Sequence, residues 1–551
     1  MTQKLISSIE NLRILEPSLT GQRVFLCSYY DDSKTPFGGG DFYYDETDTK
    51  TPDDAGTTIV TATGKRWKRV ESQKREWYAS WFGLDPSLQD CSPALQRIAS
   101  SARKRTVILP QAPRANPMRL MSPIYFQNNC GIHLIGHGAK DRTVFSDMRG
   151  TDNENQALLN FPSKNNPLWG GSEQGYAGII LENFSLLGNP LYLGDGLYLQ
   201  AQYRATYRNI TIEDFNGCAL FIDKCQDSVF DAVDIWGSGS SSGDRKNPVD
   251  SFNISKTLKN PIMIRSSYGS DKANFLRFNN CQFEDNWVCP VFSTIGGICC
   301  EFNSCHIEYN ANVDVTNTNG GTFFQGSEGV YTFNDGGIAE YRVISIGHCE
   351  LYMYNVRCTP GIDLSMTSGS NSRVYIHRTN ISSLSALATS SFKIFDNCIF
   401  TKDIAISYPD NLTYFDNCEF RGKVIGTSSS NGNIGVYFKS CHFSSEINFN
   451  SAARNIFIIG GYVIGDVSFG SGGGVFNPTK HNGALIQSSV DPYYIQPTRK
   501  QSIGANAPAS GTYRIGDIRY NTAPTAGAFI GWICISAGSP GVWKGFGAIA
   551  A

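Results

Sequence analysis

A short phrase returns several times along this chain and constrains its fold more than any other feature. It consists of an aromatic residue, two small polar residues, a cysteine, one variable residue and an apolar residue. It occurs at Phe278–Phe283, Phe302–Ile307, Phe395–Phe400, Phe415–Phe420 and Phe438–Phe443. A recurring unit of about 20–25 residues that is rich in short alternating strands is the signature of a solenoid. In a solenoid, residues at the same phase of the repeat stack in a column, so candidate site residues can be compared directly.

Strand-like alternation extends well beyond the phrase itself. From about Ser122 to about Phe476, short apolar and polar alternations are closed by Gly, Asn or Asp, which is typical of strands and turns. Charged residues make up 17% of the 551 residues and the formal net charge is −2, so a broad basic surface for nucleic acid is not expected. No window approaches ~20 consecutive apolar residues, so we expect no membrane span.

The cysteines are expected to be buried and reduced. The chain has 16 of them, and several stand at one repeat phase beside the same apolar neighbours. Cysteine packs as a small hydrophobic residue in cores. No CxxC pair is present, so the sequence predicts no zinc site and no cofactor.

The two ends of the chain differ from the repeats. Residues 1 to about 75 read as hairpins and loops with little core, and Glu71–Tyr78 reads as a linker. A helix is expected through Ala94–Ala99, with Asp90 or Ser92 as its cap, followed by a strand at Thr106–Leu109. The last stretch is richer in Pro and Gly and reads as a small separate β module.

These features carry a resemblance to a known family. The segment Trp81–Ala139 resembles the opening of the pectate-lyase-like right-handed parallel β-helix, with Trp81-Phe82-Gly83, the expected helix, a strand ending at Pro110, and Leu134–Gly138. The glycine-rich start at Gly38–Val70 and the ending at Gly511–Ile549 look like those of bacteriophage tailspike depolymerases.

The resemblance implies a homotrimer of all-β right-handed parallel β-helices that binds and cleaves capsular or other surface polysaccharide. It implies a virion protein, made in the host cytoplasm, that attaches to another phage tail protein and acts at the host surface. Tailspikes often begin with a large anchoring domain, whereas this chain has at most about 75 residues for one. The implied domains are residues 1–75 for virion attachment, 76–121 for the linker, capping helix and first strand, 122–480 for the catalytic β-helix, and 481–551 for a C-terminal β module that trimerises or binds carbohydrate.

Alignment of the repeats by phase places several candidate residues in one outward column. When the apolar residues after the cysteine phase are put in register, the next positions read Leu187, Glu213, Trp236, Glu284 and Glu308. Neighbouring backbones in such a stack are about 5 Å apart. Two carboxylates that close repel each other, so one is expected to hold a proton near neutral pH. That is the condition for a general acid beside an ionised partner.

Other residues complete the candidate site. Asp285 lies beside the column and is a further catalytic candidate. The predicted substrate-binding residues are aromatic side chains for sugar faces and arginines for an acidic substituent: Trp236, Tyr309, Tyr352, Arg265 and Arg342. Paired carboxylates favour glycoside hydrolysis.

Three other functions remain open. A polysaccharide lyase needs a base and a cation that faces a uronate, and Lys224, Lys272, Arg265 and Arg342 are available. The second is a receptor-binding fibre that binds glycan without cutting it. A cellular pectinase-like enzyme is disfavoured by the missing signal peptide and by the tail-type ends.

Overall fold

The structure is a computed structural model that divides into two units, Met1–Ile406 and Ser407–Ala551. It describes residues 3–31, 37–126, 131–150, 156–162, 178–189, 194–239, 262–265, 275–286, 292–295, 298–308, 324–335, 337–339, 344–358, 362–363, 372–381, 384–385, 391–407, 413–427, 435–449, 456–469, 474–483, 485–487 and 501–551. No helix in these ranges is long and apolar enough to cross a membrane.

The first unit begins with a small mixed sheet. Its strands are β1 (Lys4–Ile6), β2 (Arg23–Leu26), β3 (Gly40–Tyr44), β4 (Thr58–Val60) and β5 (Arg66–Arg69), in the order β1-β2-β3-β5-β4. Helix α1 (Ile9–Ile14), which Ser8 caps, packs Ile9 and Leu12 against Phe42 and Trp67. The expectation of little core is therefore wrong. The core was missed because it is assembled from strands that are far apart in the sequence.

The segment between this sheet and the coils is ordered. It forms η1 (Val70–Gln73), β6 (Glu76–Tyr78) and η2 (Ala79–Phe82), and β6 pairs in parallel with β7 (Thr106–Ile108). The segment expected to be a linker therefore contributes a strand to the stack. A Cβ at Gly38 would meet the carbonyl oxygen of Ser80 at 2.0 Å, so only glycine permits this close approach between the module and η2.

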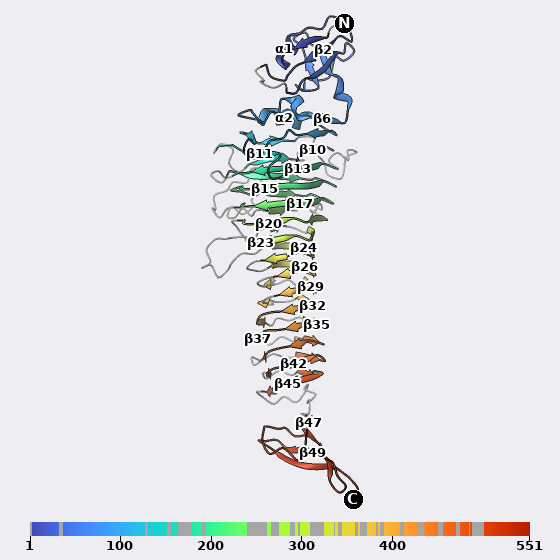
Figure 1. The fold of residues 1–551 in the computed structure, drawn as a ribbon, viewed down its shortest axis with the longest axis vertical. Helices are drawn as coiled ribbons and strands as arrows, with labels where there is room; N and C mark the ends of the chain where they lie inside the picture. The colour runs from blue at the N-terminus through green and yellow to red at the C-terminus, as the bar shows by residue number, and fades with distance from the viewer. Residues whose placement is uncertain are drawn as a thin grey trace. The chain divides into compact units, whose positions relative to one another are not determined.

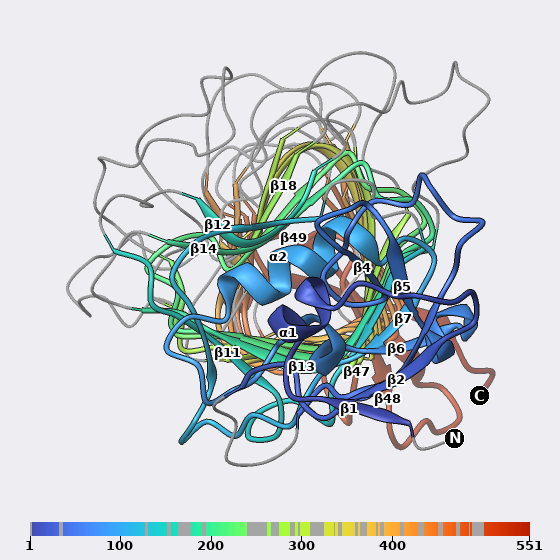
Figure 2. The ribbon, with the colours of Figure 1, turned by 90° about the horizontal axis from the view of Figure 1, so that it is seen from above.

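The predicted helix is present as α2 (Ser92–Ser101), with buried Leu95 and Ile98, and it lies across the end of the coils (Figure 2). Its N-cap is Cys91, neither of the two residues expected. The Asp90 carboxylate nevertheless accepts a hydrogen bond from the Ser92 backbone N–H at 2.8 Å.

The rest of the first unit is a parallel β-helix, seen as a stack of coils in Figure 1, and the strand pairings divide it into three sheets. The first sheet contains β7, β10 (His133–Ile135), β19 (Leu276–Asn279), β22 (Ile298–Asn303), β29 (Ser372–His377) and β32 (Ser391–Asp396). The second contains β8 (Met118–Leu120), β11 (Val144–Asp147), β20 (Gln282–Glu284), β23 (His306–Glu308), β25 (Gly337–Ala339), β27 (Arg357–Cys358), β30 (Asn380–Ile381) and β33 (Ile399–Phe400). The third contains β9 (Ile124–Tyr125), β12 (Ala157–Phe161), β14 (Asp195–Gln200), β16 (Leu220–Asp223), β18 (Ile262–Arg265) and β21 (Phe292–Ile295).

Five long strands turn a corner and serve two sheets each. They are β13 (Ile180–Leu187), β15 (Thr206–Glu213) and β17 (Val229–Trp236), between the first and second sheets, and β24 (Phe324–Asn334) and β26 (Ile344–Tyr354), between the third and first. Strands β28 (Ile362–Asp363) and β31 (Leu384–Ser385) pair in parallel, and β34 (Ile404–Ser407) is the last strand to begin in this unit. The predicted all-β fold with a parallel β-helix is confirmed.

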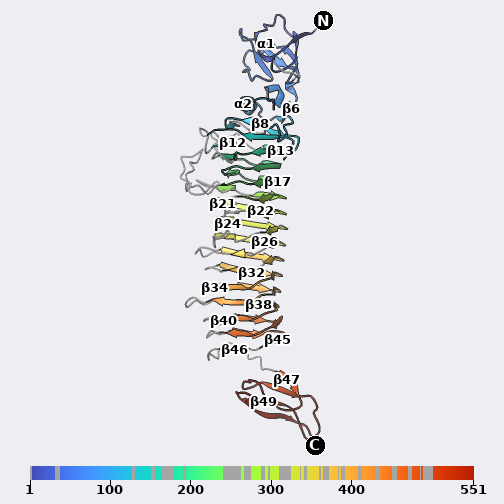
Figure 3. The same ribbon diagram turned by 60° about the vertical axis from the view of Figure 1, so that its left-hand side comes forward.

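The second unit has coils of the same kind and a final module (Figure 3). Its first sheet is β35 (Thr413–Asp416), β38 (Val436–Lys439), β41 (Ile456–Ile459) and β44 (Gly474–Asn477), and its second is β36 (Glu419–Phe420), β39 (His442–Phe443), β42 (Tyr462–Ile464) and β45 (Lys480–Asn482). Its third is β37 (Val424–Thr427), β40 (Ile447–Phe449), β43 (Val467–Phe469) and β46 (Leu485–Gln487). The module is a four-stranded sheet of β47 (Gln501–Gly504), β48 (Ile518–Asn521), β49 (Phe529–Ser536) and β50 (Val542–Ala548).

The repeated phrase forms the bend between the first and second sheets. Its aromatic residue and its cysteine point inward, as in Phe278 and Cys281, which are fully buried. The third residue of each phrase is left-handed, for example Asn280 with φ of 53° and Asn417 with φ of 52°. Asn and Ser tolerate this conformation better than most residues, which explains the two small polar positions.

The amide position of the phrase faces outward. Asn303 donates to the side-chain oxygen of Asn279 at 2.9 Å, and Asn334 donates to that of Asn303 at 2.7 Å. All three are half-buried at the surface of the first sheet. Strand alternation is the reason, because the preceding aromatic residue already occupies the inward position.

The cysteines of the phrase are buried free thiols, as predicted. The Sγ of Cys305 donates to the carbonyl oxygen of Phe278 at 3.3 Å, and the Sγ of Cys441 donates to that of Phe415 at 3.2 Å. These two thiols therefore link their coils to the preceding coils while they fill the core.

Candidate active site

The outward column predicted from the repeats exists in the second sheet. Leu187 pairs with Glu213, Glu213 with Trp236, Trp236 with Glu284, and Glu284 with Glu308. The predicted register is correct at every one of these positions. The column therefore brings three glutamate positions and a tryptophan onto successive coils.

Glu213 is engaged by a loop that crosses the column. Its side chain is buried, and its Oε1 lies 2.6 Å from the Nη1 of Arg114. The Nη2 of Arg114 is 3.8 Å from Oδ2 of Asp214, whose pKa is raised, chiefly by burial. Glu213 therefore holds the loop to the sheet, and its carboxylate is less available to a substrate than those of the neighbouring coils.

Trp236 is overlaid by a second loop. The Nζ of Lys140 lies 4.9 Å from the centroid of the Trp236 ring, within the range of a cation–π contact. The Lys140 backbone N–H donates to the Ser185 hydroxyl at 2.6 Å, which fixes this loop to the sheet. The indole Nε1 of Trp236 is buried and has no hydrogen-bond partner among the described residues.

Asp234 is a candidate that the sequence analysis missed. It stands two residues before Trp236 on β17, so strand alternation places both on the outward face. Its side chain is 15% exposed, and its Oδ2 lies 3.8 Å from the Nζ of Lys140. The pKa of Asp234 is raised to about 6, chiefly by burial; the Lys140 ammonium opposes the rise, and the Glu284 charge adds to it. Comparison of a second outward position on each strand, two residues before the first, would have revealed Asp234 in the sequence.

Glu284 lies on the coil next to Asp234. Asp234 pairs with Gln282, so Glu284 is one coil and two residues away. That offset gives Cα atoms roughly 8 Å apart, from a coil spacing of about 4.8 Å and about 3.3 Å per residue. The Oε1 of Glu284 lies 3.5 Å from the Nε2 of His306. The two carboxyl groups therefore share one surface and influence each other electrostatically.

The other catalytic candidates have different positions. Asp285 is exposed, and its φ of 52° places it at the bend that ends β20, just outside the column. Glu308 occupies the predicted column position on β23, where only its backbone is described.

Two predicted substrate-binding residues lie on other sheets. Tyr352 pairs with Thr332 and Tyr375 in the first sheet, so it is not part of the column. The bend of its coil comes three residues later, at Asn355 with φ of 54°. Arg265 pairs with Asp223 in the third sheet, and Tyr309 and Arg342 lie outside the described residues.

The arrangement of carboxyl and basic groups is suited to acid–base chemistry. Among the described residues, no group of three or more His, Cys, Asp and Glu side chains forms a metal site. The described site consists of Asp234 and Glu284 as a carboxyl pair, Trp236 as an aromatic surface, and Lys140, Arg114 and His306 as flanking basic groups.

Comparisons with known proteins bear on the N-terminal module first. Residues 5–72 match the family described as phage tail protein small four-stranded beta-sheet domain. The Mu-like prophage FluMu defective tail fiber protein of Haemophilus influenzae is 44% identical over 66 residues, which are 12% of this chain and 10% of that protein. The chain thus spans about a tenth of the length of this curated relative.

Similar solved structures include several tailspikes. The Acinetobacter phage vb_AbaP_AS12 gp42 tailspike has a TM-score of 0.45 and 13% identity, covering 97% of this chain and 86% of that one. The bacteriophage CBA120 tailspike protein 4 enzymatically active domain has a TM-score of 0.43 and 16% identity, covering 76% and 49%. The tailspike gp49 of Acinetobacter baumannii bacteriophage Fri1, a capsular polysaccharide depolymerase, has a TM-score of 0.38 and 10% identity, covering 90% and 77%. The resemblance to phage tail proteins is confirmed, with the module match as its firmest part.

Proposed function

We propose that this chain is a phage tailspike that recognises bacterial capsular polysaccharide and cleaves it by glycosidic hydrolysis. The observation that carries the proposal is that Asp234, whose pKa is raised to about 6, shares one outward surface with Glu284 of the adjacent coil. Glycosidases use one carboxylic acid to protonate the leaving oxygen and a second carboxylate as nucleophile or base. A pair whose surroundings separate the two pKa values is suited to that division of roles.

In this proposal Asp234 is the general acid. Its burial favours the protonated form, so near pH 6 about half of the molecules carry the proton that the leaving oxygen needs. Glu284, or Glu308 on the following coil, is the ionised partner, and His306 orients Glu284 through the 3.5 Å contact. Trp236 provides an aromatic surface on which a sugar ring can stack.

The N-terminal module supports a role in the virion. Its match to a phage tail domain supports attachment to another tail protein. We extend the proposal to a homotrimer in the phage tail that is made in the host cytoplasm and acts at the host surface. The molecular mass of the protein in solution, measured by light scattering, tests the homotrimer, and the mass of a monomer would contradict it.

The experiment that tests the proposal measures clearing of capsule. Purified protein is applied to a panel of capsulated bacteria, beside the variants Asp234→Asn and Glu284→Gln. The matched controls are Asp231→Asn, on the same strand but in the first sheet, and Glu419→Gln, at a second-sheet position of the other unit. We expect the site variants to lose clearing by about 100-fold or more and the controls to retain it. Full clearing by both site variants would show that this pair is not the catalytic one.

The products distinguish hydrolysis from elimination. A lyase remains the alternative because Lys140 and Arg114 place two cations at the site, where a uronate carboxylate would need one. Hydrolysis leaves a saturated reducing end, whereas elimination leaves an unsaturated uronate that absorbs in the ultraviolet. Binding of capsule without any product would identify a non-cleaving spike. The anomer released first, observed by NMR, tells whether configuration is retained or inverted.

A further inference from the structure

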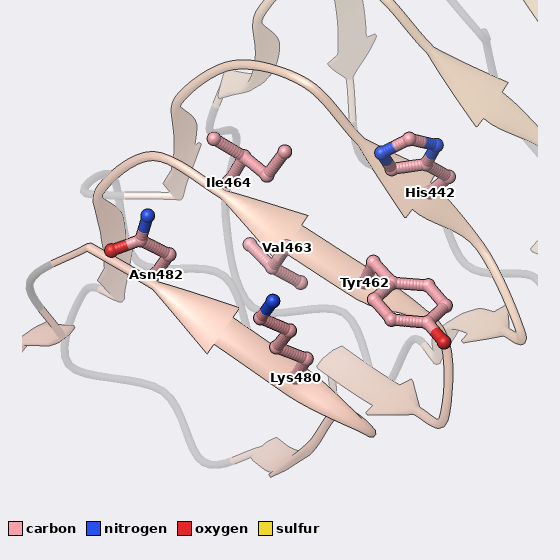
Figure 4. Close-up of a pocket in the computed structure, with 6 residues that line it drawn as sticks. All are labelled: His442, Tyr462, Val463, Ile464, Lys480 and Asn482. Atoms are coloured by element: carbon pink, nitrogen blue, oxygen red, sulfur yellow. The ribbon is translucent and has the colours of Figure 1, made fainter.

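A surface hollow in the second unit is separate from the carboxyl pair. Its volume is about 400 Å³, within the range of roughly 300–1,000 Å³ found for small-molecule sites. It lies on β39, β42 and β45, and its lining residues are His442, Tyr462, Val463, Ile464, Lys480 and Asn482 (Figure 4).

Strand register explains why these side chains converge. His442 pairs with Tyr462 and Tyr462 with Lys480, so the three stand in one outward column. Ile464 pairs with Asn482 two positions along, which gives a parallel second column. The hollow is thus built on three successive coils of the second sheet, and Figure 4 shows the two columns side by side.

The chemistry of the hollow combines an aromatic face with positive charge. Tyr462 is 51% exposed and Ile464 is 49% exposed, so an apolar surface is open to a ligand. Lys480 is exposed and makes no ion pair within the described part of the chain. None of the six lining residues carries a carboxylate, so the hollow lacks a carboxyl pair like that of Asp234 and Glu284.

We propose that this hollow binds a sugar residue that carries an acidic substituent and holds the polysaccharide without cutting it. The ring of Tyr462 would stack on the sugar face, the Lys480 ammonium would pair with the acidic group, and the Asn482 amide would hydrogen-bond to hydroxyl groups. This inference rests on the proposed function, because it takes the same capsular polysaccharide as the ligand. It adds to that function an acidic substrate class and a second binding site.

The test uses the full chain made inactive by Asp234→Asn and Glu284→Gln, so that binding is measured without cleavage. The probe is purified capsular polysaccharide from a strain that the fluorescently labelled protein stains. The same polysaccharide with its carboxyl groups reduced to alcohols is the matched probe. We expect Tyr462→Ala and Lys480→Glu each to weaken binding of the native polysaccharide by about tenfold or more. Tyr462→Phe keeps the ring and should bind as the parent does.

The control is Lys402→Glu, which removes an exposed lysine outside the hollow. Lys480→Glu should have no effect on the carboxyl-reduced probe, whereas Tyr462→Ala should weaken binding of both probes. Unchanged affinity in both hollow variants would overturn the inference. A lower oligomeric mass in the hollow variants than in the parent protein would also overturn it, because it would mean that a second copy covers this face. If the wild-type protein binds capsule through the hollow but releases no product, the cleavage proposal fails and this inference stands.

Discussion

The Nζ atom of Lys140 lies 3.8 Å from Oδ2 of Asp234, and the same ammonium lies over the ring of Trp236. One loop residue thus contacts both outward residues of β17. The positive charge favours the ionised form of Asp234, whereas burial and the charge of Glu284 favour the protonated form. The balance among these three effects determines when Asp234 carries a proton.

Stability should fall as Asp234 ionises. Its folded pKa of about 6 lies above the value of about 3.9 for an unfolded chain, so the folded state binds the proton more tightly. The free energy of unfolding should therefore decrease as pH rises from about 4 to about 6, by at most about 3 kcal/mol. Asp234→Asn should remove this loss and raise the unfolding midpoint at pH 7, with little change at pH 4.

Denaturant unfolding at a series of pH values checks this prediction. Asp231→Asn is the control, because Asp231 lies in the other sheet on the same strand and is more exposed. If Asp234→Asn lowered the midpoint equally at both pH values, burial of an ionisable carboxyl would not explain the effect.

Removal of the Lys140 charge should change the pH dependence of catalysis. In Lys140→Met, nothing from this residue opposes the effect of burial, so the pKa of Asp234 should rise further. The alkaline limb of the rate profile, near pH 6 in the wild-type protein, should move to higher pH. Reducing-end release measured from pH 4 to 9 checks this, and Lys402→Met serves as the charge control. An unshifted limb would mean that Asp234 is not the group that titrates.

The repeats predicted the coil and the column because both depend on phase alone. The period fixes which residues share a face, so the alignment of Glu213, Trp236 and Glu284 needed no tertiary information. Asp234 was missed because only one outward position per strand was compared. Its raised pKa depends chiefly on burial in the folded chain, and Lys140, which opposes the rise, comes from a loop far away in the sequence.

Other features depend on contacts that no local pattern contains. The first-sheet position of Tyr352 was not evident from the sequence, because its coil lacks the cysteine that marks phase and its left-handed residue is Asn355. The core of the N-terminal module brings Leu12 against Trp67 across a long stretch of sequence. Neither short periodicity nor composition reports such pairings.

Arg69 should connect the N-terminal module to the coils. Its guanidinium lies 4.6 Å from the ring centroid of Phe42 and 4.8 Å from that of Trp81, and it donates to the carbonyl oxygens of Gly38, Gly39 and Gly56. Arg69→Met would leave three carbonyl groups without this donor, which should cost about 3 kcal/mol.

Calorimetry and limited proteolysis of the full chain check the Arg69 prediction. We expect a lower first transition and faster cleavage within residues 1–75, while Arg23→Met, at an exposed position of β2, behaves as wild type. Equal transitions in both variants would show that this arginine does not support the junction.

The left-handed residue of the repeated phrase should tolerate glycine but not a β-branched residue. Asn417 has φ of 52° and an exposed side chain, and its backbone N–H donates to the Lys439 carbonyl oxygen at 2.8 Å. Asn417→Gly should leave the unfolding midpoint nearly unchanged, whereas Asn417→Val should destabilise the coil by about 1–2 kcal/mol because its Cβ crowds the carbonyl. Ser444→Val, at an exposed position without positive φ, is the matched control and should have little effect. Denaturant midpoints of the three variants test this, and equal losses in both valine variants would trace the cost to the added side chain instead of the backbone conformation.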